Sequence, residues 1–204
     1  MTDAPFRPFD THLDEATALA TLRAATAGAD DGELFLERRR AESIVLDDGR
    51  IRQATYDASQ GFGLRAVRGE VAGYAHSTDI SDSALRRASE TARLAVGSGG
   101  GTLAAGPRGT NTRLYQPIDP MSDATFPVKI ELLRDIDAYA RDLDPRVVQV
   151  SATLSASLQE IEILRPDGQR LTDIRPMARI NVSVMIEDAG RREQGGMGKG
   201  GRHG

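Results

Sequence analysis

The sequence contains neither cysteine nor tryptophan, and only two of its 204 residues are lysine. Without cysteine the chain can form no disulfide, no thiolate metal site and no thiol nucleophile, a composition that fits a reducing cytoplasm. No run of about 18 apolar residues occurs, so no transmembrane helix is predicted. The N-terminus also lacks the basic start and apolar stretch of a signal peptide. We therefore predict a cytoplasmic protein with no membrane partner.

The charge balance is mildly acidic, with a formal net charge of -4 and a pI near 5.5. Nucleic-acid binders carry a basic stripe, so this balance argues against nucleic acid as a partner. The one basic run, Arg38-Arg39-Arg40, is flanked by acidic residues at 33, 37 and 42. Such alternation of sign indicates a charged, solvent-facing strand.

The first half of the chain reads as a helix, a series of strands and a second helix. Thr11 and Asp14 form a capping-box pattern for a helix over 11–27, which Gly28 would end. Asp48-Gly49 is a strong hairpin signal, because a tight turn needs positive φ. Helical spacing returns over 81–96. Short strands are predicted at 34–39, 43–47, 51–56, 62–67 and 71–76.

The second half repeats this order. A segment rich in Gly, Pro, Thr and Ser at 97–126 is the best linker in the chain, and a helix over 128–143 follows it. Alternating apolar residues then predict strands at 148–158, 161–164, 171–174 and 180–186. Turns are predicted at Pro166-Asp167-Gly168 and Ala189-Gly190.

These patterns predict an α+β protein made of two related units of antiparallel β-meander sheet packed with helices. We place a first domain at 1–98, a linker at 99–126 and a second, β-rich domain at 127–204. The second domain would stop within a glycine-rich segment, GGMGKGGRHG, that shows no periodicity. Such a segment is typical of a disordered terminus or of an opened loop in a longer protein.

The candidate chemical groups do not assemble into a site. The three histidines, His12, His76 and His203, are far apart, and neither an H-E-x-x-H nor a G-x-S-x-G motif occurs. The G-x-G-x-x-A match at 61–66 lies in a predicted strand, whereas a dinucleotide fingerprint must open a helix. Gly198-Lys199 lacks both the first glycine and the Ser or Thr of a P-loop. We therefore assign no catalytic, cofactor-binding or metal-binding residue in this chain.

Several short motifs nevertheless resemble the TldD/PmbA metallopeptidases, once called modulators of DNA gyrase, and most closely the TldD branch. They occur in family order along most of the chain. The matching positions are residues 60–67 with Gly69, Gly73-Tyr74-Ala75, Asp119-Pro120, Lys129, Leu132-Leu133-Arg134, Asp137, Arg175-Pro176, 178–187, Arg191-Arg192-Glu193 and the glycine-rich 195–204.

This resemblance implies that the chain is the N-terminal portion of a longer peptidase acting on peptides or unfolded proteins. In the family, a zinc-type site is supplied by an H-E-x-x-x-H helix and a later thiolate, both C-terminal to the residues present here. The N-terminal part would then contribute to dimerisation, with itself or with a paralogue, and to the wall of a chamber that receives extended peptides. Residues 190–204 would be a flexible segment beside that channel.

Two other functions fit the same sequence. The parent protein could be a PmbA-like, non-catalytic partner subunit, or the chain could be a stand-alone β-sheet module that binds peptides by strand addition. DNA association is suggested only by the older family name, and the acidic balance argues against it.

Overall fold

The computed structural model describes residues 5–97, 100–105, 116–122 and 124–202. The four helices of this part are α1 (Pro8–Thr11), α2 (Glu15–Ala25), α3 (Asp82–Val96) and α4 (Phe126–Leu143). Its six strands are β1 (Asp31–Asp47), β2 (Arg50–Arg68), β3 (Val71–Ser77), β4 (Val147–Leu164), β5 (Arg170–Asp188) and β6 (Arg191–Gly201).

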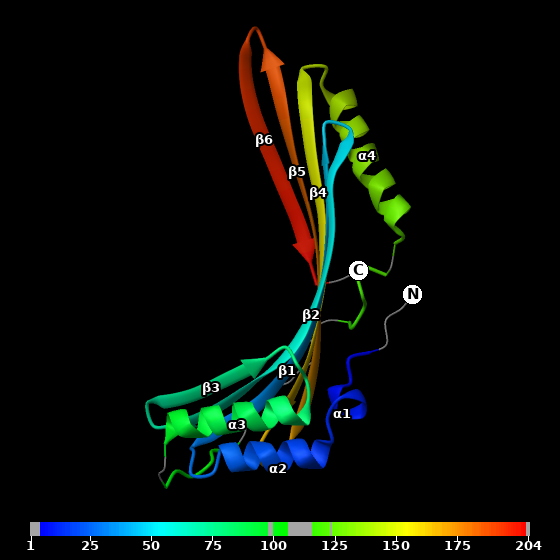
Figure 1. The fold of residues 1–204 in the computed structure, drawn as a ribbon. Helices are drawn as coiled ribbons and strands as arrows, with labels where there is room; N and C mark the ends of the chain where they lie inside the picture. The colour runs from blue at the N-terminus through cyan, green and yellow to red at the C-terminus, as the bar shows by residue number, and fades with distance from the viewer. Residues whose placement is uncertain (1–4, 98–99, 106–115, 123, 203–204) are drawn as a thin grey trace.

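All six strands form one antiparallel sheet in the order β3-β2-β1-β4-β5-β6. The two predicted meanders are β1–β2–β3 and β4–β5–β6, and the α+β class is confirmed. Pairing of β1 with β4 joins the two meanders into one continuous sheet, which the separate units of the prediction did not include. Figure 1 shows this sheet as a long, curved ribbon.

The short strands predicted from the sequence are parts of much longer ones. The runs at 34–39 and 43–47 both belong to β1, and those at 51–56 and 62–67 both belong to β2. Similarly, 148–158 and 161–164 merge into β4, while 171–174 and 180–186 merge into β5. Arg40 and Glu160, which lie between the apolar runs, stay within the sheet, where their side chains are 3.8 Å apart across β1 and β4.

The long helices all lie on one face of the sheet. In Figure 1, α2 and α3 lie beneath the lower part of the ribbon and α4 lies beside its upper part. The covered face carries the even-numbered side chains of β1 and β4, because successive side chains of a strand point to opposite faces. No described helix covers the opposite face.

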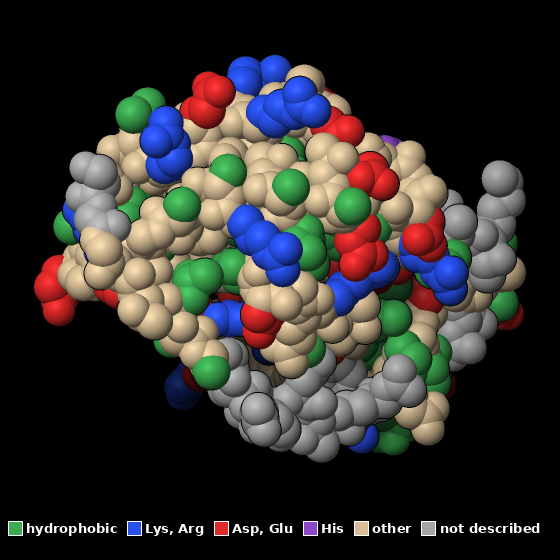
Figure 2. Space-filling view, turned by 90° about the horizontal axis from the view of Figure 1, so that it is seen from below, with side chains coloured by type: hydrophobic (Ala, Val, Ile, Leu, Met, Phe, Trp, Pro, Cys, Tyr) green, Lys and Arg blue, Asp and Glu red, His purple; other side chains and the backbone are tan. Residues whose placement is uncertain are grey.

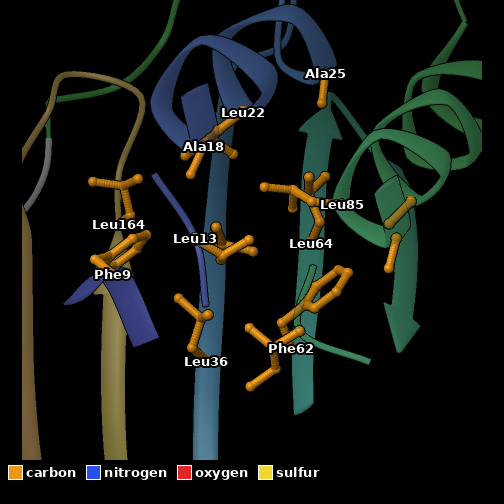
Figure 3. Close-up of a cluster of buried hydrophobic side chains, with 14 of the residues drawn as sticks. Phe9, Leu13, Ala18, Leu22, Ala25, Leu36, Phe62, Leu64, Leu85 and Leu164 are labelled. Carbon is orange, nitrogen blue, oxygen red and sulfur yellow. The ribbon is translucent and has the colours of Figure 1, made fainter. Parts of the chain in front are cut away.

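The larger hydrophobic core lies between the lower sheet and helices α1 to α3. Leu36, Phe62 and Leu64 project from the strands toward Leu22 and Leu85 of the helices (Figure 3). Each large aliphatic side chain that is fully buried contributes about 1.5–3 kcal/mol to the free energy of folding.

The outer surface of the helical layer mixes Lys and Arg with Asp and Glu, and Figure 2 shows no continuous basic stripe on it.

The upper half has a much smaller core. Its main cluster consists of the buried residues Ile44, Leu46, Leu133 and Ala152, and Val150 of β4 is also fully buried. The even-numbered residues Ile180 and Val182 of β5 are only partly covered, and every residue from Arg191 to Gly200 of β6 is exposed. The backbone ladder with β5 therefore holds β6 with little help from side-chain packing.

The helix ends follow their capping residues. The helix predicted over 11–27 is the shorter α2, because Asp14 rather than Thr11 caps it, accepting a hydrogen bond from Thr17 N at 2.8 Å. Thr11 instead ends the short α1, where its hydroxyl donates to Arg7 O. Ser81 caps α3, and Gly97 ends it at a φ of 73°.

Both predicted two-residue hairpin turns are confirmed. Asp48 and Gly49 have φ values of 50° and 71°, and Ala189 and Gly190 have values of 49° and 81°. Positive φ at both central residues is the type I′ pattern, whose twist matches that of the flanking strands. Ala189 adopts a conformation that alanine disfavours by roughly 1–2 kcal/mol.

Most of the described part of the glycine-rich tail forms a strand, contrary to the prediction of a flexible, unpatterned segment. Residues 191–201 form β6, the edge strand of the upper sheet. A Cβ atom at Gly198 or Gly200 would collide with β5. These glycines leave room for Arg179, whose Nε donates to Asn181 Oδ1 at 2.8 Å, to lie over the strand. Close approach of β5 side chains, rather than flexibility, accounts for these glycines.

Candidate functional site

The described residues contain no metal centre. No group of three or more His, Asp or Glu side chains converges among them. His12 is exposed after α1, and His76 is stacked on Tyr74 in β3 with 5.7 Å between ring centroids. His203 lies outside the described residues. The described side chains therefore do not provide the three or four convergent donors that a metal ion requires.

The two glycine motifs lie in strands, which was predicted for residues 61–66 but not for Gly198-Lys199. Gly61 and Gly63 lie within β2, so no helix begins there to receive a phosphate. A Cβ at Gly61 would meet Ser77 O at 2.6 Å, and one at Gly63 would meet the Tyr74 hydroxyl at 2.6 Å. Lys199 lies in β6 rather than at the start of a helix. Neither motif can hold a nucleotide in the way its pattern suggests.

Buried charges gather midway along the sheet, where the two meanders meet. Arg38 Nη2 and Glu160 Oε2 are 2.8 Å apart, and Arg40 Nη2 lies 3.2 Å from Asp119 Oδ2 and 3.8 Å from Glu160 Oε2. Arg40 is 8% exposed and Glu160 6%. The prediction of a solvated face for the arginine run is therefore wrong for Arg40, which is buried and pairs with Asp119 and with Glu160 of β4.

A second buried pair ties α4 to the same region. Lys129 is 5% exposed, and its Nζ donates to Glu42 Oε1 at 2.6 Å and to Met121 O at 2.8 Å. We call Arg38, Arg40, Glu42, Lys129 and Glu160 the waist cluster. Together with Asp119 it fixes the chain before α4 against the sheet. Its groups pair with one another, so this arrangement acts as a structural joint.

The uncovered face of the upper sheet is hollowed. It carries odd-numbered side chains of β1, β4 and β5. Those of β4 from 149 to 157 are all Ser, Thr or Gln, whereas β1 and β5 add charged and apolar side chains such as Arg39, Arg179 and Met177. Three shallow hollows of about 290, 300 and 330 Å³ lie along this face. Their lining includes Ser43, Thr55, Ser151, Thr153, Ser155, Ser157, Asn181 and Ser183. We call this surface the seryl face.

One edge of the seryl face is an unpaired strand. β3 pairs with residues 62–68 of β2, so residues 50–61 form the edge of the upper sheet among the described elements. Residues 52–60 are all exposed. An exposed edge offers backbone N–H and C=O groups to an added strand, so the seryl face and this edge could together receive an extended peptide.

Comparison with known proteins decides the family. Residues 32–96 match the family described as PmbA/TldA metallopeptidase domain 1, and residues 119–204 match its central domain. The chain belongs to the PmbA/TldD metallopeptidase family. Membership implies a divalent metal in the full-length protein, although the described residues supply no site for one.

Two curated relatives carry the name metalloprotease TldD homolog. The protein of Buchnera aphidicola from Acyrthosiphon pisum is 33% identical over 190 residues, which cover 93% of this chain and 39% of that protein. The Haemophilus influenzae protein is 37% identical over 179 residues, covering 86% of this chain and 37% of that protein. The chain thus spans less than two fifths of these relatives.

Solved structures share the fold at low sequence identity. TldE from Thermococcus kodakarensis has a TM-score of 0.73 and 16% identity, covering 91% of this chain and 43% of that one. A proposed modulator of a DNA gyrase from Thermotoga maritima has a TM-score of 0.74 and 14% identity, covering 93% of this chain and 43% of that one.

Among the described residues of this PmbA/TldD chain, no helix has the length and apolar character needed to cross a membrane.

Sequence reasoning missed the buried acids of β4, although a signal was present. Leu154, Ala156 and Leu158 mark the covered face, and Glu160 and Glu162 follow in the same register. Charged residues at positions that the alternation assigns to the core indicate buried ion pairs or a polar site.

Proposed function

We propose that the chain is the N-terminal scaffold of a longer metallopeptidase and that the seryl face forms part of the wall of its peptide chamber. The observation that carries this proposal is the one-sided layering of the sheet. Helices cover one face, whereas the opposite face is uncovered, hollowed, lined in part by Ser and Thr, and bordered by an unpaired strand. Such a surface is better suited to bind the backbone of an extended peptide than an apolar surface of a folded protein.

The proposal includes the partner and the substrate class. The scaffold pairs with a second copy or with a paralogue, and the enclosed space admits peptides or unfolded proteins in extended form. The family names of the relatives support peptidase chemistry, and the absence of metal donors among the described residues is consistent with a reactive centre elsewhere in the parent. In this proposal, the scaffold positions substrate and supplies none of the reacting groups.

Site-specific photo-crosslinking in the full-length protein tests this placement. A photoreactive amino acid at Thr55, which is exposed in a hollow of the seryl face, should crosslink to a labelled unfolded peptide. The matched control is Leu94 on α3, which is 73% exposed on the helical layer and should give only background crosslinking. Equal yields at the two positions would contradict the proposal. Crosslinking at Thr55 without peptide hydrolysis would favour the non-catalytic partner function.

A further inference from the structure

A separate cavity lies on the helical face, in the lower half of the sheet. It has a volume of about 490 Å³ and is bounded by the N-terminal segment around Phe6 and Arg7 and by strands β4 and β5. Glu160, Glu162 and Arg170 line its floor. These even-numbered residues project from the same face of the sheet, so their side chains point toward the cavity.

Most charges around the cavity are already paired. Glu160 accepts hydrogen bonds from Phe6 N at 3.0 Å and from Arg38 Nε at 2.8 Å. Arg7 Nη1 lies 3.7 Å from Asp10 Oδ2. Asp173 accepts from Arg175 Nε at 2.6 Å. These groups have little left to offer a ligand.

Glu162 differs, because one of its oxygens has no donor. The residue is 3% exposed, and its Oε1 accepts two hydrogen bonds from Arg170, from Nε at 3.1 Å and from Nη2 at 2.5 Å. Its Oε2 is buried and has no hydrogen-bond partner among the described residues. Buried carboxylate oxygens are almost always paired, so an unpaired one indicates a missing donor.

Arg170 cannot turn to supply that donor. Its Nη1 donates to Glu15 Oε2 at 2.9 Å, and its guanidinium lies over the Phe9 ring at 4.9 Å from the centroid. These contacts, together with the two hydrogen bonds to Oε1, hold the guanidinium in place. The donor for Oε2 therefore comes from outside the described residues, as a water molecule or as a group that enters the cavity.

The chemistry of Glu162 Oε2 indicates which class of ligand could bind there. A single unpaired oxygen suits the compact ammonium group, whereas a guanidinium fork prefers two oxygens side by side. A metal ion would need three or more acidic or imidazole donors, and the described residues offer no such group. A cavity of this volume accommodates a lysine side chain or the first residue of a peptide.

We propose that this cavity binds a primary ammonium group, from a lysine side chain or from a peptide's α-amino end, through Glu162 Oε2. This site is independent of the seryl face and of the proposed chamber. A scaffold that holds a basic group here would anchor a peptide or partner segment on the helical side of the sheet.

Calorimetric titration of the full-length protein with three probes tests the site. N-acetyl-lysine methylamide presents only a side-chain ammonium, alaninamide presents only an α-ammonium, and N-acetyl-norleucine methylamide has neither. One or both cationic probes should bind, and the tighter one identifies the source of the ammonium group. Equal affinity of the uncharged probe, or no binding of either cation at millimolar concentration, would overturn the proposal.

Two variants locate the binding. Glu162→Gln should weaken the cationic probe at least tenfold, while Glu131→Gln, on the exposed side of α4, should leave its Kd unchanged. Ile174→Trp keeps Glu162 but fills the cavity, and it should also abolish binding. Thermal unfolding of each variant checks that it is folded. Unchanged Kd in a folded Glu162→Gln or Ile174→Trp protein would remove the cavity from consideration.

Discussion

The buried pair of Lys129 and Glu42 provides a stringent test of how α4 is held to the sheet. Replacing Lys129 by Met preserves most of the side-chain volume but removes the cation. Glu42, whose side chain is only 17% exposed, would lose its partner at 2.6 Å, and Met121 O would lose its donor. Removing one member of a buried pair costs about 3–5 kcal/mol, because the other charge remains buried.

The double variant Lys129→Met/Glu42→Met separates this cost from the value of the pair itself. Replacing both charges by apolar groups removes the uncompensated carboxylate, so the double variant should recover most of the stability lost in Lys129→Met. Urea unfolding followed by circular dichroism measures each free energy of unfolding. The lost hydrogen bond at Met121 O should leave a residual deficit of about 1 kcal/mol.

The chain offers a matched control, because its other lysine is exposed. Lys199→Met on β6 should change the free energy of unfolding by less than about 0.5 kcal/mol. A loss below about 1 kcal/mol in Lys129→Met would refute the reasoning. So would a double variant that is as unstable as the sum of the two single variants, because the two residues would then not be coupled.

Three further predictions concern the strands and turns of the second meander. Ala189→Asn should raise the free energy of unfolding by about 1 kcal/mol, because Asn tolerates the positive φ that Ala189 adopts, and a lower thermal midpoint would contradict this. Gly198→Ala should lower the thermal midpoint, since a Cβ there would meet Asn181 Oδ1 and Arg179 Nη2, whereas Gly195→Ala, with no atom within 4 Å, should not. Hydrogen bonds from the Arg146 side chain and backbone lower the pKa of Asp144 from 3.8 to about 2. The stability that this carboxylate contributes is therefore present above pH 4 and is lost as the pH falls toward 2, so Asp144→Asn should flatten acid unfolding in that range.

The sequence predicted the local structure well because the signals were local. Asp48-Gly49 and Ala189-Gly190 were predicted as turns, and these residues do adopt the positive φ values that the turns require. The alternation over 148–158 lies within β4. The length of the strands was not predictable from apolar runs. Arg40 and Glu160 interrupt the apolar pattern, and only the partner strand shows that they pair there. The β6 strand was missed because its ladder depends on β5 and its glycines lack any hydrophobic pattern.

The candidate sites were predictable only in part. The sequence predicted that the G-x-G-x-x-A match at 61–66 lies in a strand, and Gly61 and Gly63 do lie within β2. The cavity at Glu162 depends on the N-terminal segment lying against β4 and β5, more than 150 residues away along the chain. Such proximity is a property of the fold, and no spacing within the sequence encodes it.

The junction between β1 and β4 has a consequence for how the molecule forms. Each meander pairs residues that are close in the sequence, whereas partners across this junction are separated by more than a hundred positions. Closing such a long loop is entropically costly, so contacts of this kind form late and slowly. Each three-stranded half should therefore assemble first, and docking of the halves should limit the rate. Substitutions at Arg38 or Glu160, which pair across the junction, would then increase the unfolding rate more than they decrease the rate at which each three-stranded half assembles.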